Sequence, residues 1–182
     1  MPRTARKDDL LALRELERAA GAAFRDLGMA AVADDEPPSV TELAAFQQDG
    51  RAWVITDSAD RPVAYLLLDV VDGNAHVEQV SVHPDHARQG LGKTLLDTAA
   101  AWAVQRGLAA LTLTTYLDVP WNAPYYQRLG FQIMAESQIG DGLRRICEHE
   151  QARGLARWPR VTMRRPVGNQ DLSHQHGESC QE

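Results

Sequence analysis

The chain is poor in cysteine, in long apolar runs and in net positive charge. Its two cysteines, Cys147 and Cys180, cannot build a disulfide framework and lack the paired spacing of a metal site. With 19 basic and 25 acidic side chains, a net charge of −6, it lacks the basic excess typical of nucleic-acid-binding proteins. No apolar run approaches the roughly 18 residues of a membrane span, since Asp69 interrupts even 63–71. We therefore expect a cytoplasmic protein that binds small molecules and has no metal, nucleic-acid or membrane partner.

The composition indicates one globular domain. The chain has 182 residues, of which 44% are hydrophobic and 24% charged, as in ordinary single domains. Residues 168–182 contain almost no apolar side chains, so we predict a disordered tail there and a folded domain over 1–167.

Strand and helix patterns alternate along this domain. Apolar spacing predicts helices at about 10–20, just after Ser39, from 91 towards 107, after Asn122 and at 141–153. Asp8 would cap the first helix, and Ser39 with Glu42 has the spacing of a capping box. The predicted strands cover 52–56, 62–71, 75–82, 110–114, 131–135 and 160–164. This order predicts an α/β protein, α+β by some schemes, with a mixed, mostly antiparallel sheet and helices on both faces.

The strand at 75–82 changes the phase of its apolar residues. Val77 lies at an odd position, whereas Val80 and Val82 lie at even ones, so a regular strand would expose one set. One extra residue near Glu78–Val80, a β-bulge, would return all three valines to one face. An irregular strand covered on both faces explains the pattern equally well.

A glycine-containing loop joins this strand to the next helix. Gly90 and Gly92 would let the backbone approach a ligand, and the helix N-terminus offers unpaired N–H groups that suit phosphate. The stretch from Ala87 to Thr94 also differs at one position from the G-x-x-x-x-G-K-[ST] loop of nucleoside triphosphatases. Residues 83–86 separate this loop from its strand, and the best apolar strand that ends in aspartate precedes the loop instead of following it. Both features count against a phosphotransferase.

Two motifs stand in a fixed order in the second half of the chain. The first is a strand ending in V-x-P, then [RQ]-x-x-G-x-[GA] and a helix, which here spans 80–93. The second is an N-x-x-A-x-x-x-Y-x-x-x-G-F type pattern, present in compressed form at 122–131. Together they resemble the Gcn5-related N-acetyltransferase (GNAT) family, although Ala87 stands where the family usually has arginine or glutamine, and Arg88 follows it. The resemblance covers about 3–167, and two motifs in this order and separation make it specific.

The resemblance implies an N-acetyltransferase domain over 1–167 that moves an acetyl group from acetyl-CoA directly to an amine. It implies a splayed strand pair that holds the pantetheine arm, a glycine loop that holds the pyrophosphate, and no metal. The bulge would free a backbone N–H near Val80 to face the thioester oxygen. The expected cofactor-binding residues are Val80, Ser81, Val82, Arg88, Gln89, Gly90, Leu91, Gly92, Lys93 and Asn122. Asn122 would bond the cofactor arm or cap its own helix.

The resemblance also names the groups that would carry the reaction. Tyr126 matches the family's tyrosine acid, and its ordinary pKa near 10 would keep the proton on the phenol until the leaving thiolate takes it. The alternative is an aromatic side chain that only packs the short helix. Glu78 is the candidate base because it lies on the strand beside the expected acetyl site. Its alternatives are a solvated or substrate-anchoring role for Glu78 itself, and His76 or His83 as the base.

The charge distribution bears on the acceptor. Residues 144–165 hold seven arginines and two acids, a net +5, which leaves −11 for the rest of the chain. The acidic remainder would attract a cationic amine, either a small molecule or a peptide. We consider 34–36 as a substrate gate and Trp121 as a pocket wall, against ordinary surface and packing roles. The arginines would contact a second copy in a homodimer, contact the cofactor or stay solvated. A non-catalytic acyl-CoA-binding module of the same fold is the alternative to an enzyme.

Overall fold

The computed structural model describes residues 1–168, so residues 169–182 of the predicted tail lie outside the described residues. Seven strands in 1–168 form one sheet in the order β1-β2-β3-β4-β5-β7-β6. The strands are β1 (Arg3–Thr4), β2 (Ala52–Thr56), β3 (Pro62–Val71), β4 (Asn74–Val82), β5 (Ala110–Tyr116), β6 (Gln132–Ile133) and β7 (Arg160–Pro166). All neighbours are antiparallel except the parallel pair β4 and β5. The predicted mixed, mostly antiparallel sheet is therefore confirmed.

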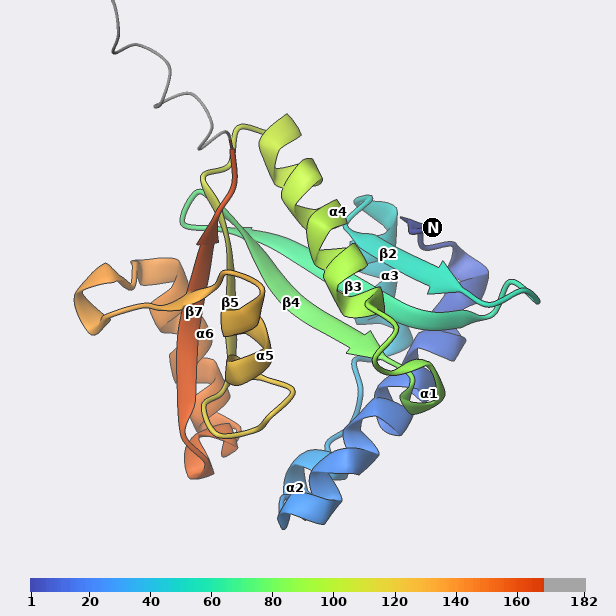
Figure 1. Ribbon diagram of the computed structural model, residues 1–182, viewed down its shortest axis with the longest axis horizontal. Helices are drawn as coiled ribbons and strands as arrows, with labels where there is room; N and C mark the ends of the chain where they lie inside the picture. The colour runs from blue at the N-terminus through green and yellow to red at the C-terminus, as the bar shows by residue number, and fades with distance from the viewer. Residues whose placement is uncertain (169–182) are drawn as a thin grey trace, which may run out of the picture.

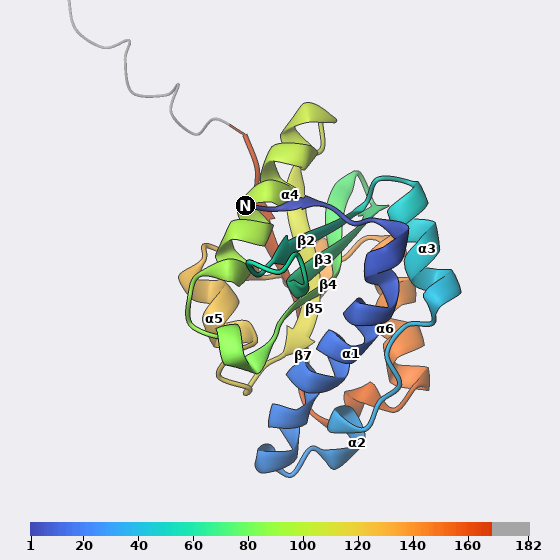
Figure 2. The ribbon, with the colours of Figure 1, turned by 90° about the vertical axis from the view of Figure 1, so that its right-hand side faces the viewer.

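Helices cover both faces of this sheet, as the sequence predicted. They are α1 (Leu10–Gly21), α2 (Ala30–Ala33), α3 (Val40–Gln48), α4 (Leu91–Gln105), α5 (Ala123–Arg128) and α6 (Asp141–Ala152), with short 3-10 helices η1 to η5 between them. Helices α4 and α5 lie on one face, and α1, α3 and α6 lie on the other (Figures 1 and 2). None of these helices, in the part of the chain that the structure describes, is long and apolar enough to cross a membrane.

Local sequence signals located the central elements well and the ends less well. Strands β2 and β3 have the predicted bounds, and the capping box at Ser39 is formed, with the Glu42 N–H donating to Ser39 Oγ at 3.2 Å. The strand predicted at 131–135 was wrong in length, because only Gln132–Ile133 pairs with β7. Strand β1 was not predicted.

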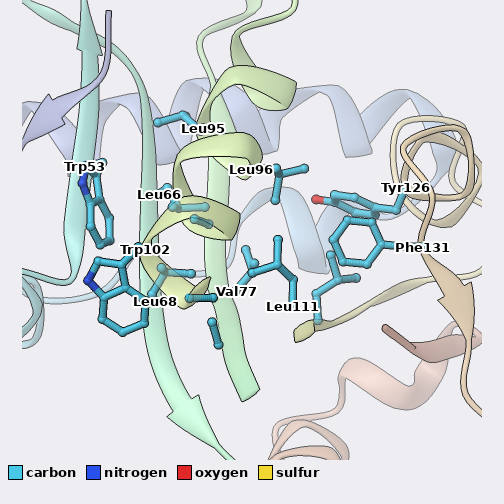
Figure 3. Packing of buried hydrophobic residues seen from close by; sticks show 14 of the residues in the cluster. Trp53, Leu66, Leu68, Val77, Leu95, Leu96, Trp102, Leu111, Tyr126 and Phe131 are labelled. Atoms are coloured by element: carbon cyan, nitrogen blue, oxygen red, sulfur yellow. The ribbon is translucent and has the colours of Figure 1, made fainter. Parts of the chain in front are cut away.

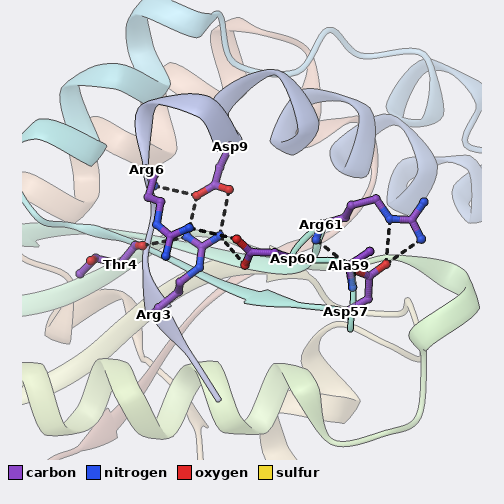
Figure 4. Close-up of polar contacts among 8 residues, drawn as sticks. All are labelled: Arg3, Thr4, Arg6, Asp9, Asp57, Ala59, Asp60 and Arg61. Atoms are coloured by element: carbon purple, nitrogen blue, oxygen red, sulfur yellow. Dashed lines mark hydrogen bonds and ion pairs between the residues drawn. The ribbon is translucent and has the colours of Figure 1, made fainter.

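The predicted cap at Asp8 was wrong. The chain first makes η1 (Lys7–Asp9), and the neighbouring Asp9 accepts the Arg6 N–H at 2.7 Å. The guanidinium of Arg3 donates to both oxygens of Asp9, at 2.7 and 3.1 Å (Figure 4). Arg3 and Arg6 also pair with Asp60, which follows β2. Asp9 therefore joins the N-terminal segment to the start of α1, while its ion-pair partner Arg3 joins that segment to the β2–β3 turn.

The larger apolar core lies between the sheet and the helices α4 and α5. It contains residues of the strands β2 to β5 together with Leu95, Leu96 and Trp102 of α4 and Tyr126 of α5 (Figure 3). Val77 belongs to this core, and Val80 and Val82 pack against it. These valines share one face because Leu67 pairs with Gln79 while Leu68 pairs with Val77, which leaves Glu78 without a partner. The predicted β-bulge is confirmed, and Glu78 is the extra residue.

The tip of the β3–β4 hairpin is tied to helix α6. The Asp72 carboxylate accepts the Gly142 and Leu143 N–H groups, both at 2.9 Å, and so fills the N-terminal turn of a helix that starts far along the chain. A Cβ on Gly142 would come within 2.6 Å of Asp72 Oδ1, so the close approach requires glycine there.

Candidate active site

An opening forms where β4 and β5 separate. The two strands pair only at Ala75 with Leu111 and at His76 with Thr112, and beyond these pairs they diverge (Figure 1). Glu78 lies two residues beyond His76, so the bulge lies close to the point where the sheet opens. The second half of β4 has β3 on one edge and no strand on the other. Its backbone groups on the open edge can therefore bind an extended ligand.

The glycine loop leads from the open end of β4 to the N-terminus of α4. Arg88 and Gly90 have φ angles of 59° and 76°, and such rare backbone conformations gather at ligand sites. The N-cap residue makes no side-chain bond to α4, so N–H groups of its first turn, apart from that of Lys93, which faces the Tyr125 hydroxyl, remain available to an anion. The Tyr125 hydroxyl lies over this turn, because a Cβ on Gly92 would come within 2.9 Å of it. Gly92 thus leaves room for the Tyr125 side chain.

Asn122 holds a buried acceptor without a partner. It occupies the N-cap position of α5, yet its side chain makes no capping hydrogen bond. Its Oδ1 atom is buried and meets no donor among residues 1–168. An unsatisfied buried acceptor is costly, and sites that bind polar ligands provide a reason to keep one. The capping role considered for Asn122 is therefore not the one observed.

Tyr126 lies in the core beside the opening. Its ring makes edge contacts with Tyr125 and Phe131, and its hydroxyl points towards Leu96 of α4 (Figure 3). Burial raises the pKa of Tyr126 well above its ordinary value, and the nearby charges of Tyr125 and Glu17 raise it further. The phenol consequently keeps its proton at neutral pH.

Glu78 and His76 lie next to each other at the bulge. His76 is 2% exposed; its Nδ1 contacts Thr112 Oγ1 at 3.0 Å, and its Nε2 lies 3.9 Å from Glu78 Oε2. Burial lowers the pKa of His76 to about 4, so this imidazole is neutral at pH 7 and a weak base. The Glu78 side chain is 46% exposed; its partial burial, assisted by the charges of Asp69 and Glu150, raises the pKa of Glu78, which strengthens that carboxylate as a base.

His83 and the acidic stretch 34–36 serve other purposes. His83 Nδ1 accepts the Asp85 N–H at 3.2 Å and so caps the short helix η3 (Pro84–His86). Each acid of the stretch pairs with an arginine: Asp34 with Arg25, Asp35 with Arg153 at 2.8 Å, and Glu36 with Arg14 at 3.4 Å. Because these carboxylates are already compensated, the stretch is a poor candidate for a gate that attracts amines.

One polar cluster beside the opening escaped the sequence analysis. Helix α1 carries Glu17, whose carboxylate accepts hydrogen bonds from Tyr65 of β3 and from Gln79 and Ser81 of β4. Burial raises the pKa of Glu17. A signal was present in the sequence, because Glu17 follows the buried Leu10 and Leu13 at helical spacing and so falls on the inward face of α1.

The geometry of the glycine loop does not support the hypothesis of a phosphotransferase. Helix η3 separates β4 from the glycines, and β4 is antiparallel to β3, whereas a triphosphate loop leaves its strand directly. Residues 1–168 contain no group of three or more histidine, cysteine, aspartate or glutamate side chains placed to hold a metal ion.

Comparison with known proteins finds similarity to one family of enzymes. The model of the acetyltransferase (GNAT) family matches residues 12–131. The peptidyl-lysine N-acetyltransferase YjaB of Salmonella typhimurium is 26% identical over 99 residues, which are 54% of this chain and 62% of that protein. YjaB of Escherichia coli is 23% identical over 99 residues, 54% of this chain and 61% of that protein. The match thus spans about three fifths of these relatives.

Solved structures share the fold over nearly the whole chain. The ribosomal-protein-S18-alanine N-acetyltransferase from Escherichia coli has a TM-score of 0.61 at 21% identity, covering 94% of this chain and 97% of that one. The PaiA N-acetyltransferase from Thermoplasma acidophilum, solved with coenzyme A, has a TM-score of 0.66 at 14% identity, covering 92% and 98%.

Proposed function

The chain belongs to the GNAT acetyltransferase family, and we propose that it moves an acetyl group from acetyl-CoA to an amine by direct transfer. The observation that carries this proposal is the opening between β4 and β5, which begins at the Glu78 bulge and leads to the uncapped N-terminus of α4. An extended thioester fits such an opening, because its amides can pair with a free strand edge while its phosphates reach a helix N-terminus.

The proposed cofactor contacts follow the opening from end to end. The backbone of Val80–Val82 would hold the pantetheine arm, and the Asn122 Oδ1 would accept an N–H of that arm. The N–H groups from Arg88 to Lys93 would hold the pyrophosphate. Support for this assignment comes from the Oδ1 atom that lacks a donor and from the positive φ angles of the loop.

Glu78 is the proposed base. An amine must lose a proton as its nitrogen attacks the thioester carbonyl, and the raised pKa of Glu78 lets this carboxylate take that proton directly or through water. His76 supports this role by its position, since the neutral imidazole borders Glu78 without competing for the proton. The backbone N–H near Val80 would stabilise the oxyanion that forms with the new C–N bond.

Tyr126 is the proposed acid. When the C–S bond breaks, the thiolate needs a proton, and the Tyr126 hydroxyl would supply it. A free thiol has a pKa near 8.5, so a phenol with a raised pKa would be a poor donor to a thiolate in water. Burial raises the pKa of a thiol beside Tyr126 as well as that of the phenol, so the two pKa values rise together; the transfer would leave a phenolate, which would regain a proton from solvent before the next turnover.

Peptidyl lysine is the acceptor to test first. The two curated relatives are named peptidyl-lysine N-acetyltransferases, and the acidic body of this chain would favour a cationic acceptor. Other peptide amines and small amines share the required nucleophile. The cytoplasmic location and the homodimer remain predictions from the sequence.

The test is thiol release from acetyl-CoA by the full chain, with a panel of lysine peptides, peptides with free N-termini, and polyamines. We expect release that depends on one class of amine, and a product whose mass has increased by one acetyl group. Coenzyme A binding without product from any amine would indicate a non-catalytic module. Stabilisation by magnesium-ATP, with no response to acetyl-CoA, would overturn the assignment altogether.

A further inference from the structure

The Glu17 carboxylate connects helix α1 with two strands. Its Oε2 atom accepts the Tyr65 hydroxyl at 2.8 Å and the Ser81 hydroxyl at 2.6 Å, and its Oε1 atom accepts the Gln79 amide at 2.9 Å. The Gln79 amide also donates to Ser81 Oγ at 2.9 Å, so the two β4 side chains are held to each other as well. Tyr65 is fully buried and Ser81 is 8% exposed, so these are protected contacts.

The two β4 residues that Glu17 holds are those on either side of Val80. Side chains alternate along a strand, so Gln79 and Ser81 point towards α1 while Val80 points into the opposite core. Fixing both neighbours fixes the peptide units of Val80. The contacts of Gln79 and Ser81 are important because pairing between β4 and β5 stops at His76. On the edge of β4 that faces β5, no strand restrains the segment 79–82.

On the basis of the proposed acetyl transfer, we propose that Glu17 is a positioning residue that fixes the segment 79–82 of β4 as the wall of the cofactor site. It acts through Gln79 and Ser81, whose contacts determine where the backbone of Val80 lies. The carboxylate suits this task because all three of its neighbours donate hydrogen bonds. An amide in its place would keep one acceptor oxygen and turn an NH2 group towards a neighbour that now donates to Glu17.

The experiment compares Glu17→Gln with the matched control Tyr65→Phe. The control removes one hydrogen bond from the same carboxylate but leaves both contacts to β4 intact. Hydrogen exchange of the segment 79–82 is measured by mass spectrometry, together with coenzyme A affinity and with kcat and KM in the full chain. The first two readouts do not require turnover.

We expect exchange in this segment to accelerate about 10-fold in Glu17→Gln, because local opening becomes easier, and to change less than about 2-fold in Tyr65→Phe. The value of kcat should fall roughly 10- to 100-fold in Glu17→Gln, since displacement of a reacting group by about 1 Å costs that much, while KM for the amine changes little. In the control Tyr65→Phe, kcat should stay within about 3-fold of wild type, a much smaller loss than in Glu17→Gln.

Unchanged exchange in Glu17→Gln would overturn the proposal, whatever the activity. Equal losses of kcat in both variants would also overturn it, because a general loss of stability would then explain them. If the wild type acetylates no amine, the proposed function fails, and coenzyme A affinity then tests the role of Glu17. A loss of affinity in Glu17→Gln alone would support the positioning role, and equal affinities in the three proteins would refute that role. If Glu17→Gln does not fold, Glu17→Asp replaces it, with faster exchange in support and unchanged exchange against.

Discussion

Replacing Asn122 with alanine should have opposite effects on the free protein and on its complex. In the free protein the Oδ1 atom is buried without a donor and the side chain makes no capping bond. An unsatisfied buried polar atom costs about 1–3 kcal/mol, so its removal should stabilise the free protein by up to that amount. The usual loss of about 1 kcal/mol on truncation of an N-cap does not apply, because no capping bond exists to lose.

The complex should change in the other direction. If the Oδ1 atom accepts an N–H of the cofactor arm, binding relieves the penalty in the wild type, and Asn122→Ala forgoes that gain. A loss of about 1–3 kcal/mol corresponds to a Kd for coenzyme A that is roughly 5- to 150-fold weaker. The free variant should melt up to about 2–4 °C higher for each kcal/mol gained in a chain of this size.

Two measurements decide the matter, namely urea unfolding of the free protein and calorimetric titration with coenzyme A. A matched control is Asn74→Ala, since Asn74 already donates to the Asp72 carbonyl at 3.1 Å and lies at the far end of β4. The control should lose stability slightly and bind coenzyme A normally. An Asn122→Ala protein that is less stable when free and binds coenzyme A as tightly as wild type would refute the reasoning.

Three further predictions concern proton transfer and stability. Tyr126→Phe should lower kcat by about 100-fold or more, as loss of a general acid does, and leave the Kd for coenzyme A nearly unchanged; unchanged kcat at saturating substrate would remove Tyr126 as the acid. Glu78→Gln should lower kcat/KM most near about pH 6–7, where free amine is scarce, and least at high pH; a constant ratio to wild type would exclude a base. Asp9→Asn should lower the free energy of unfolding by about 1–3 kcal/mol at pH 7, a value between those for exposed and buried ion pairs. Burial raises the pKa of Asp9, but bonds from Arg3 and Arg6 outweigh it, and the net pKa is lowered. The Asp9 contribution should therefore be complete above the carboxylate's ordinary pKa and vanish as the pH falls through the lowered one. Urea unfolding at several pH values checks this, and a pH-independent difference between the proteins would contradict it.

Local signals in the sequence were enough for the elements whose boundaries depend on local chemistry. The valine phase predicted a bulge near Glu78–Val80 as one of two equal explanations, because side chains alternate along a strand with a period of two, and the β3–β4 register decided for the bulge. The short strand β1 could not be predicted, because it exists through the pairing of Arg3 with Val54, and neither partner signals the other. The start of α1 was misplaced for another reason: Arg3 and the Arg6 N–H bond Asp9 and not Asp8, and helix-capping rules do not anticipate these contacts.

The candidate site also contains residues that the sequence predicted and one residue, Glu17, that it did not. Motifs predicted the glycine loop and Tyr126, and the position of Glu78 on its strand made it the candidate base. Strand β4 connects the Glu78 bulge with the loop. Glu17 was missed because its partners Ser81 and Tyr65 are 64 and 48 residues away in the chain. Only its place on the apolar face of α1 indicated a buried carboxylate, and that position alone does not name its partners.

The bond between Asp72 and the first turn of α6 has a consequence for how the protein unfolds. The hairpin β3–β4 and the C-terminal helix share this carboxylate, so neither can open without exposing polar groups of the other. The two regions should therefore lose protection together as one cooperative unit. Loss of the Asp72 contact, whether it begins in the hairpin tip or in α6, would loosen β4 at its Asn74 end, the end from which the strand runs to Glu78.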